Sequence, residues 1–285
     1  MQSSLDVQYI GATGVGCTNW YVTEAQWMYD VSGFMFFSEN IVANPTTYPS
    51  IMSMSYGWSE ADQCQISPSS PPCSDGSAAF VQAVNANFLK YSTSGHTLFA
   101  SSGDSGAHGR TDPTCQDPKV RPAFPAASPY VTAVGATQFD TSNVKTGGSA
   151  PVCSTLGPCA ESGTEIVASP KTGALIASGG GFSNVAPMPA WAHAAQTAYQ
   201  GISGACPPNG DYNSSGRGFP DVAALGHNYY IQLQGQEYHV DGTSCSSPVW
   251  AGVLSLINSY EISKGRSAVG FLNPTLYKLP ASAFN

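Results

Sequence analysis

The chain has 285 residues, of which 42% are hydrophobic and 10% are charged, and its formal net charge at pH 7 is -8. That length supports one large hydrophobic core or at most two small ones, and the 14 Tyr and 12 Phe residues exclude a disordered chain. The acidic balance argues against nucleic-acid binding, since phosphate contacts need a basic surface. No apolar run approaches the ~20 residues of a membrane span.

The first half of the chain predicts short strands that alternate with helices. Residues 77–94 are expected to form a helix that stops at Gly95, because apolar residues recur there at helical spacing, namely Phe80, Val84, Phe88 and Tyr91. A shorter helix is expected at residues 2–9. Runs rich in β-branched or aromatic residues predict strands at residues 34–37, 51–56, 96–100 and 130–134.

The second half begins with a Ser-, Gly- and Thr-rich stretch, residues 141–181, which is expected to run over the surface. Residues 229–234 predict a strand in a hairpin that turns through Gly235. After Ser244 a long helix is expected to run to a stop at Gly265, because one apolar period continues through it: Val249, Val253, Ile257 and Tyr260.

Strands that alternate with helices, with glycine-rich loops after the strands, predict an α/β fold: one mostly parallel central sheet with helices on both faces. There is no internal repeat and no linker, so residues 1–285 are interpreted as a single domain. Sheets of this kind place their functional sites at the carboxyl ends of the strands.

The eight cysteines indicate an oxidising compartment. Two pairs, Cys64 with Cys73 and Cys153 with Cys159, bracket short Ser/Pro/Gly-rich segments as loop disulfides would. No CxxC pair exists, so no structural zinc site is expected. Asn213 opens the glycosylation sequon Asn-Ser-Ser, which favours the secretory route, although the first residues do not form a signal peptide.

Three segments carry candidate catalytic residues. "QSSLDVQY" contains Asp6, "LFASSGDSGAHG" delivers Asp104 from an apolar strand into a glycine-serine turn, and "VDGTSCSSPVW" places Ser244 where a tight turn meets a helix. Each has a structural alternative, because Ser ordinarily caps helix N-termini and Asp ordinarily forms Asx-turns. Taken one at a time, the segments leave both interpretations open.

Together these segments resemble the sedolisins, the serine-carboxyl peptidases, and within them the tripeptidyl-peptidase branch. The ordered matches that carry the resemblance are "SLDVQYI", "SMSYGW", "SSGDSGA", "RPAFPAASPYVTAVGAT", "SGGGFSNV", "GRGFPDVAAL", "DGTSCSSPVWAGVLSLIN" and "GFLNPTLY". The resemblance implies a subtilisin-like α/β fold. It also implies a monomer that acts on peptides or unfolded proteins, either secreted or in a lysosomal, acidic compartment.

The resemblance implies a role for each matching position. Ser244 would be the nucleophile that forms an acyl-enzyme. Asp104 would be the oxyanion-hole residue, which donates a hydrogen bond only when protonated. Asp6 would orient the general base. Residues 55–57, which are Ser55, Tyr56 and Gly57, would pair with the substrate backbone by strand addition.

The base position departs from the family pattern. The sedolisin base is a glutamate four residues before the aspartate, on the same helix face, and here that position holds Gln2. A carboxamide cannot accept the serine proton as a carboxylate can, and loss of general-base catalysis costs ~10²–10⁴-fold. The alternative is therefore a peptide-binding pseudoenzyme that has lost turnover.

The resemblance also implies that this is a partial peptidase domain. The family's prosegment and the start of its peptidase domain are expected to be absent, and its calcium loop would lie beyond Asn285. No metal or other cofactor is therefore expected in this chain.

Other nucleophile chemistries fit this sequence less well. A Ser-His-Asp enzyme would carry a His-Gly-Thr-His stretch at the start of a helix, and this chain has none. Packing or surface roles are therefore expected for its histidines, which are His96, His108, His193, His227 and His239. Cys245 is interpreted as a buried free thiol, and paired-carboxylate aspartic protease chemistry is not expected beside so clear a serine motif.

Overall fold

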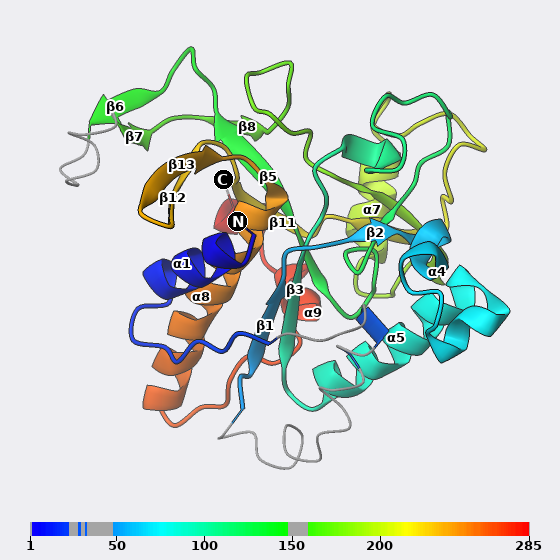
Figure 1. Cartoon of the computed structure of the whole chain (residues 1–285), viewed down its shortest axis with the longest axis horizontal. Coiled ribbons are helices and arrows are strands. Elements are labelled where there is room, and N and C mark those ends of the chain that lie inside the picture. Colours follow the sequence, from blue (N-terminus) through cyan, green and yellow to red (C-terminus); the bar gives the residue numbers. More distant parts are fainter. Residues whose placement is uncertain (1, 23–27, 30–31, 33–47, 148–158, 285) are drawn as a thin grey trace.

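A parallel sheet forms the centre of the molecule (Figure 1). The structure is a computed structural model that describes residues 2–22, 28–29, 32, 48–147 and 159–284. The strands lie in the order β1-β3-β5-β11 and all pair in parallel, while β8 joins the end of β5 antiparallel. Their bounds are β1 Ile51–Met54, β3 Thr97–Ser101, β5 Thr132–Phe139, β8 Glu165–Val167 and β11 Val222–Leu225. The predicted, mostly parallel central sheet is confirmed.

Both faces of the sheet are buried, as the unbroken apolar sequence of β3 requires. Leu98 and Ala100 point into one core cluster, and Phe99 between them points into the other. Successive side chains of a strand point to opposite faces, so this one strand contributes to both layers. The expectation of helices on both faces follows directly from such strands and is confirmed.

The helix α5, Ser77–Thr93, covers one face of the sheet. Its predicted apolar stripe is fully buried, and the exposed fractions of Phe80, Val84, Phe88 and Tyr91 are 0%, 0%, 1% and 4%. The stripe packs against Leu98, Ala100, Phe124 and Ala133. Local periodicity was sufficient here because the helix has a single inner face.

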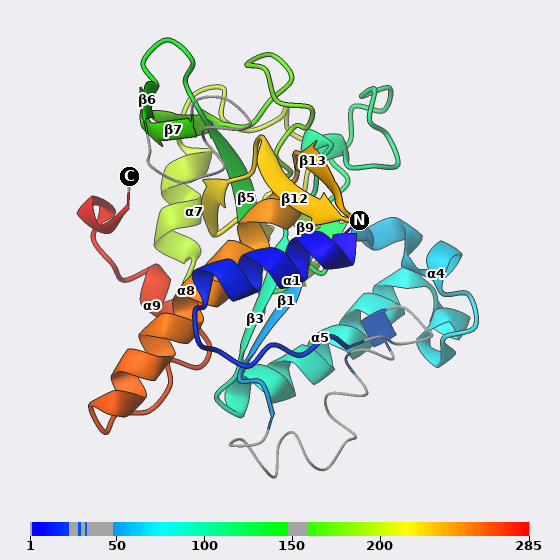
Figure 2. The same ribbon diagram turned by 60° about the vertical axis from the view of Figure 1, so that its left-hand side comes forward.

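The helices α8, Thr243–Ser263, and α1, Gln2–Thr13, pack together on the other face (Figure 2). Both were predicted, α1 four residues shorter. The apolar period used to predict α8 faces outward, however, since Val253, Ile257 and Tyr260 are 39%, 43% and 58% exposed. Its inner face uses Ala251, Gly252 and Leu254, because small residues allow the sheet and α1 to approach closely.

Gly252 sets the distance between α8 and α1. A Cβ atom at this position would lie 2.0 Å from Thr13 Oγ1 and 2.8 Å from the backbone nitrogen of Gly14. Contacts that short force a shift, so Gly252→Ala is expected to push α1 outward and to lower the free energy of unfolding by about 1–3 kcal/mol. Urea unfolding measures the change.

The matched control is Gly201→Ala, at the C-terminal end of α7, His193–Gln200. The φ angle of Gly201 is -76°, and a Cβ atom there would meet two carbonyl oxygens, at 3.4 and 3.6 Å. Its effect is expected to stay within about 0.5 kcal/mol. Equal destabilisation by the two substitutions would show that the crossing of α1 and α8 is not tightly packed.

Smaller elements surround the sheet. Within the described ranges, four two-stranded pairs form: β2 Trp58–Ser59 with β4 Ala123–Phe124, β9 Gly181–Pro187 with β10 Gly216–Phe219, β12 Tyr229–Leu233 with β13 Gln236–Val240, and β6 Lys145–Gly147 with β7 Cys159–Ser162. The remaining helices and turns are η1 Glu60–Asp62, α4 Gln63–Ile66, η2 Pro71–Asp75, η3 Gly106–His108, α7 His193–Gln200, α9 Asn273–Leu276 and η4 Ala281–Ala283.

The predicted β12–β13 hairpin is confirmed and supports α1 (Figure 2). It turns through Gln234 and Gly235, which both have positive φ angles (52° and 77°), as a two-residue hairpin turn requires. The Gln8 side chain of α1 donates to the carbonyl of Gln232 at 2.8 Å and accepts from its backbone N–H at 3.0 Å. Tyr9 Oη donates to the carbonyl of Tyr230 at 2.6 Å.

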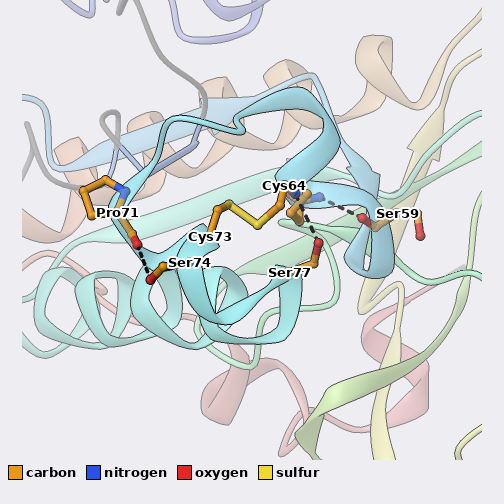
Figure 3. Close-up of a disulfide and its surroundings, with 7 residues drawn as sticks. Ser59, Cys64, Pro71, Cys73, Ser74 and Ser77 are labelled. Carbon is orange, nitrogen blue, oxygen red and sulfur yellow. Dashed lines mark hydrogen bonds between the residues drawn. A yellow bond between two sulfur atoms is a disulfide. The ribbon is translucent and has the colours of Figure 1, made fainter.

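Cys64 and Cys73 form the expected loop disulfide, with their Cα atoms 5.5 Å apart (Figure 3). It joins α4 to η2, next to the start of α5, where the Ser77 hydroxyl accepts a hydrogen bond from the backbone of Cys64. The expected partner of Cys159, Cys153, lies outside the described residues, as does the strand expected at residues 34–37.

Other strand boundaries moved by one to five residues. The strand expected at 51–56 ends at Met54, the one at 96–100 runs from Thr97 to Ser101, and the one at 130–134 runs from Thr132 to Phe139. The prediction that residues 141–181 only cross the surface is wrong in its last part. Ala168, Ala174 and Ile176 form a small buried cluster with Ala136.

Candidate active site

Ser244 lies in the first turn of α8, at the carboxyl-end edge of the sheet. It is only 8% exposed, and its Oγ donates to the carbonyl of Ser55, 3.1 Å away, just beyond the end of β1. Among the described residues, the Ser244 side chain makes no hydrogen bond to a backbone amide of its own helix. Its hydroxyl is held by the segment that follows β1 and does not serve as a helix cap.

Asp104 follows β3 and is bound to the residue next to Ser244. Its Oδ1 accepts hydrogen bonds from the backbone N–H and the hydroxyl of Thr243, both at 2.8 Å. The Thr243 hydroxyl also accepts from the Gly103 N–H at 3.1 Å. Asp104 therefore joins two distant segments, which the Asx-turn alternative does not require. Asp104 Oδ2 lies near Ser244 across Gly242. A Cβ atom added to Gly242 would be 3.7 Å from Asp104 Oδ2 and 3.4 Å from the Cβ of Ser244.

Ser244 and Asp104 line one pocket, together with the expected substrate-binding residues. Its walls include residues 55–59 after β1, residues 101–104 at the end of β3 and residues 243–244 at the start of α8. These three chain segments meet here because the carboxyl ends of parallel strands share one edge. Ser55, Tyr56 and Gly57 follow directly after β1, which ends at Met54, and line the pocket wall.

Gln2 and Asp6 approach the site from α1 without lining the pocket. The Gln2 side-chain amide donates to Asp6 Oδ1 at 3.0 Å, one helical turn away. Burial raises the pKa of Asp6 to about 6, and hydrogen bonds with Ser55 and Gln2 oppose that rise. Ser55 therefore links the two halves of the site: it contacts Asp6 through its side chain and accepts from Ser244 through its carbonyl.

No histidine is among the residues that line the pocket. His96 is buried against the ring of Tyr91, with centroids 4.3 Å apart. His227 Nδ1 lies 2.7 Å from Asp241 Oδ2, on the loop before Ser244. Among the described residues, this is the one histidine–carboxylate pair within salt-bridge distance, and the sequence did not predict it.

Cys245 is a free, fully buried thiol, as expected. It packs with Leu5 and Ile231 between α1 and the hairpin. Burial, with nearby acidic groups, holds the pKa of this thiol far above its usual range. Because the thiolate is the reactive form, Cys245 is suited to packing and not to nucleophilic attack.

The sequon residue Asn213 is partly buried. Its side-chain amide donates to the carbonyl of Ser183 at 2.8 Å, and its oxygen accepts from the backbone and hydroxyl of Ser215. A glycan on this nitrogen would leave one N–H to make the bond to Ser183. Glycosylation of Asn213 stays a prediction.

Glu60 is a buried carboxyl near the site that sequence reasoning missed. It is 2% exposed and accepts hydrogen bonds from the Ser183 hydroxyl at 2.5 Å and the Asn184 N–H at 2.7 Å. Burial raises the pKa of Glu60 to about 7, although these hydrogen bonds and Arg217 oppose the rise. Its partners lie more than 120 residues away in sequence, so no local sequence pattern predicts that Glu60 is buried.

Glu60 makes the stability of the fold depend on pH. Between its ordinary pKa of 4.5 and its folded pKa of about 7, the folded state holds a proton that the unfolded chain releases. The free energy of unfolding is therefore expected to fall as pH rises through that window, by up to roughly 3 kcal/mol. Asp6 adds a change of the same sign between 3.8 and about 6.

The variant Glu60→Gln is expected to flatten this dependence, since the amide binds no proton. Urea unfolding of both proteins at about pH 4 and pH 8 measures the two slopes. Glu237→Gln, at an exposed position of the hairpin, is the matched control and is expected to leave the slope unchanged. A Glu60→Gln slope equal to that of the parent chain would contradict the assigned protonation.

Known proteins similar to this chain identify its family. The family model described as "Subtilase family" matches residues 21–269. Physarolisin of Physarum polycephalum is 40% identical over 286 residues, which cover 99% of this chain and 48% of physarolisin. Human tripeptidyl-peptidase 1 is 35% identical over 284 residues, which cover 98% of this chain and 42% of that protein. The chain thus spans about half the length of these relatives.

The fold is also found among solved structures. A Pseudomonas sedolisin, described as a serine-carboxyl proteinase, aligns with a TM-score of 0.63 at 23% identity, over 97% of this chain and 64% of the other. Among the residues that the structure describes, no helix is both long and apolar enough to cross a membrane. The same residues contain no cluster of three or more His, Cys, Asp or Glu side chains that could hold a metal ion.

The family model covers most of the chain, and the relatives match nearly all of it. This chain therefore belongs to the subtilase family of serine-type peptidases, and within it to the sedolisin group.

Proposed function

We propose that this chain carries the nucleophile and the oxyanion-hole residue of an acid-acting serine-carboxyl peptidase. The observation that carries the proposal is that Ser244 and Asp104 line one pocket at the carboxyl ends of the parallel strands. Ser244 would attack a peptide carbonyl and form an acyl-enzyme. Water would then release the acyl group in the second half of the reaction.

Asp104 would stabilise the oxyanion by donating a hydrogen bond. Its Oδ1 is occupied by two donors from Thr243, which leaves Oδ2, on the side of Gly242 and Ser244, to carry the proton. A carboxyl group can donate only when it is protonated, whereas a carboxylate base must be ionised. These two demands overlap only at acidic pH, which fits a secreted or lysosomal peptidase.

The substrate would lie along the pocket wall formed by residues 55–57. Strand addition uses backbone hydrogen bonds for affinity and leaves selectivity to side-chain pockets. Similarity to tripeptidyl-peptidase 1 favours release of N-terminal tripeptides from a peptide or unfolded protein.

A second candidate is a peptide-binding pseudoenzyme. It is favoured by Gln2, whose amide donates to Asp6 and so preserves the packing of a base without its basicity. In the structure the Ser244 hydroxyl donates to a carbonyl, and a carbonyl cannot remove the proton during attack. Under this alternative the pocket binds peptides but does not turn them over.

A hydrolysis assay with a quenched fluorescent peptide, run from about pH 3 to pH 7, tests the proposal. Turnover that peaks at acidic pH and is lost in Ser244→Ala supports the peptidase. Peptide binding to the parent chain without turnover supports the pseudoenzyme. Turnover that survives Ser244→Ala would overturn the assignment of Ser244 as the nucleophile, and it would also exclude the pseudoenzyme.

A further inference from the structure

The pocket beside Ser244 contains an arginine with no acidic partner. The guanidinium carbon of Arg110 lies 4.5 Å from the ring centroid of Tyr56 and 5.1 Å from that of Trp58, and all three residues line the pocket. Among the described residues, none places a carboxylate within ion-pair distance of Arg110. Its charge is held by aromatic faces instead.

The other arginines of this chain are all paired with carboxylates. These pairs are Arg121 with Asp117, Arg217 with Asp221, and Arg266 with Glu261. The formal net charge of the chain is -8, so acidic side chains are abundant and an unneutralised guanidinium is the exception. Arg110 is exposed, and the two rings fix its direction without consuming its N–H donors.

Two polar side-chain atoms lie buried behind the pocket surface. Ser102 lines the pocket and is 1% exposed, and its hydroxyl has no partner among the described residues. The indole N–H of Trp58 is likewise buried without a partner. Because both atoms are buried, the guanidinium of Arg110 is the group in this part of the pocket that an occupant can reach directly.

Asp104 is the acidic side chain among the residues that line the pocket. Its Oδ1 is taken by Thr243, and in the protonated form that the oxyanion role requires it would not repel an anion. Arg121 adds a second guanidinium to the wall, although Asp117 neutralises it. The net charge that faces the pocket is therefore positive whenever Asp104 is protonated.

We propose that this pocket selects peptides with an acidic side chain, Glu or Asp, next to the bond that faces Ser244, and that Arg110 is the specificity-determining residue. The inference rests on the proposed function, because it requires a peptide backbone along residues 55–57. The carboxylate would form a charge-assisted hydrogen bond with Arg110.

Binding measurements test the inference without requiring turnover. Isothermal titration calorimetry of the full chain with Ala-Ala-X-Ala-Ala-Ala, where X is Glu, Gln or Leu, is run at about pH 5.5, where Glu is ionised. The Glu peptide is expected to bind about fivefold more tightly than the Gln peptide. High salt is expected to reduce that ratio, since the pair is partly exposed.

Three variants identify the cause. Arg110→Gln is expected to bring the Glu-to-Gln ratio close to one, and Arg110→Lys to retain part of it, because the charge remains but the planar stacking is lost. Arg266→Gln removes the same charge at the far end of α8, and it is expected to leave the ratio unchanged.

Equal affinity for the Glu and Gln peptides, or a preference for Glu that persists in Arg110→Gln, would overturn the inference while leaving the peptidase proposal standing. If no peptide binds and Gln2→Glu shows no turnover, the proposed function fails and the inference fails with it. The two failures are therefore distinguishable.

Discussion

The variant Gln2→Glu is expected to raise kcat/KM for peptide hydrolysis at acidic pH by about 10²–10⁴-fold over the parent chain. Residue 2 lies one helical turn from Asp6, and the two side chains are already hydrogen bonded at 3.0 Å. A glutamate there would share a proton with Asp6, because two carboxyl groups so close do not both ionise. Whichever of these two carboxyl groups is ionised could then accept the Ser244 proton. A pH–rate profile with a quenched fluorescent peptide measures the gain.

Two controls assign that gain to general-base catalysis. Gln2→Glu combined with Ser244→Ala is expected to lose it entirely, and Gln2→Glu combined with Asp6→Asn is expected to lose much of it, since Asp6 would orient the new base. Circular dichroism spectra of all variants check that α1 remains folded. An unchanged rate in a folded Gln2→Glu variant that binds peptide would contradict the role assigned to residue 2.

Loss of the buried arginine is expected to give the largest effect on stability. Arg217 is 0% exposed, and its guanidinium donates to the carbonyls of Ser128, Val131 and Gly218 and to Asp221 Oδ2, 2.5 Å away. Arg217→Met would leave the Asp221 carboxylate buried without its counter-charge. Such losses cost about 3–5 kcal/mol, or roughly 10 °C in Tm for a chain of this size.

Calorimetry and urea unfolding measure that loss. Arg266→Met is the matched control, because its ion pair with Glu261 is exposed and is expected to contribute less than about 1 kcal/mol. The double variant Arg217→Met with Asp221→Asn is expected to lose less than the sum of the two single losses. Additive losses would indicate that the two side chains do not stabilise each other.

Features that depend on neighbouring residues could be predicted from the sequence. The helix α5 was correctly predicted because its apolar residues all lie on one helix face, and the β12–β13 hairpin was correctly predicted because Gly235 and the residues beside it determine the turn. The strand ends were less accurate, by one to five residues. Strand pairing, which sets those ends, depends on partners far away in the sequence.

Features that depend on distant partners could not be predicted. The outward face of α8 carries Val253, Ile257 and Tyr260, and its inner face follows the approach of α1 at Gly252. From its sequence position Glu60 would be expected at the surface, but its contacts with Ser183 and Asn184 bury it. In each case the contact that determines which residues are buried joins segments far apart in the sequence, so local periodicity cannot reveal it.

The sequence by itself, through its resemblance to the sedolisins, identified the residues proposed to carry the chemistry: a serine at the head of the last long helix, an aspartate after a buried strand, and Gln2 where a base would stand. Each of these residues lies in a short motif that can be recognised without knowing its distant partners. Only the tertiary structure decided that Ser244 and Asp104 share one pocket and that Arg110 lies across Tyr56 and Trp58 in it. These segments come together because the strands pair in parallel, and strand pairing is a property of the whole packed sheet.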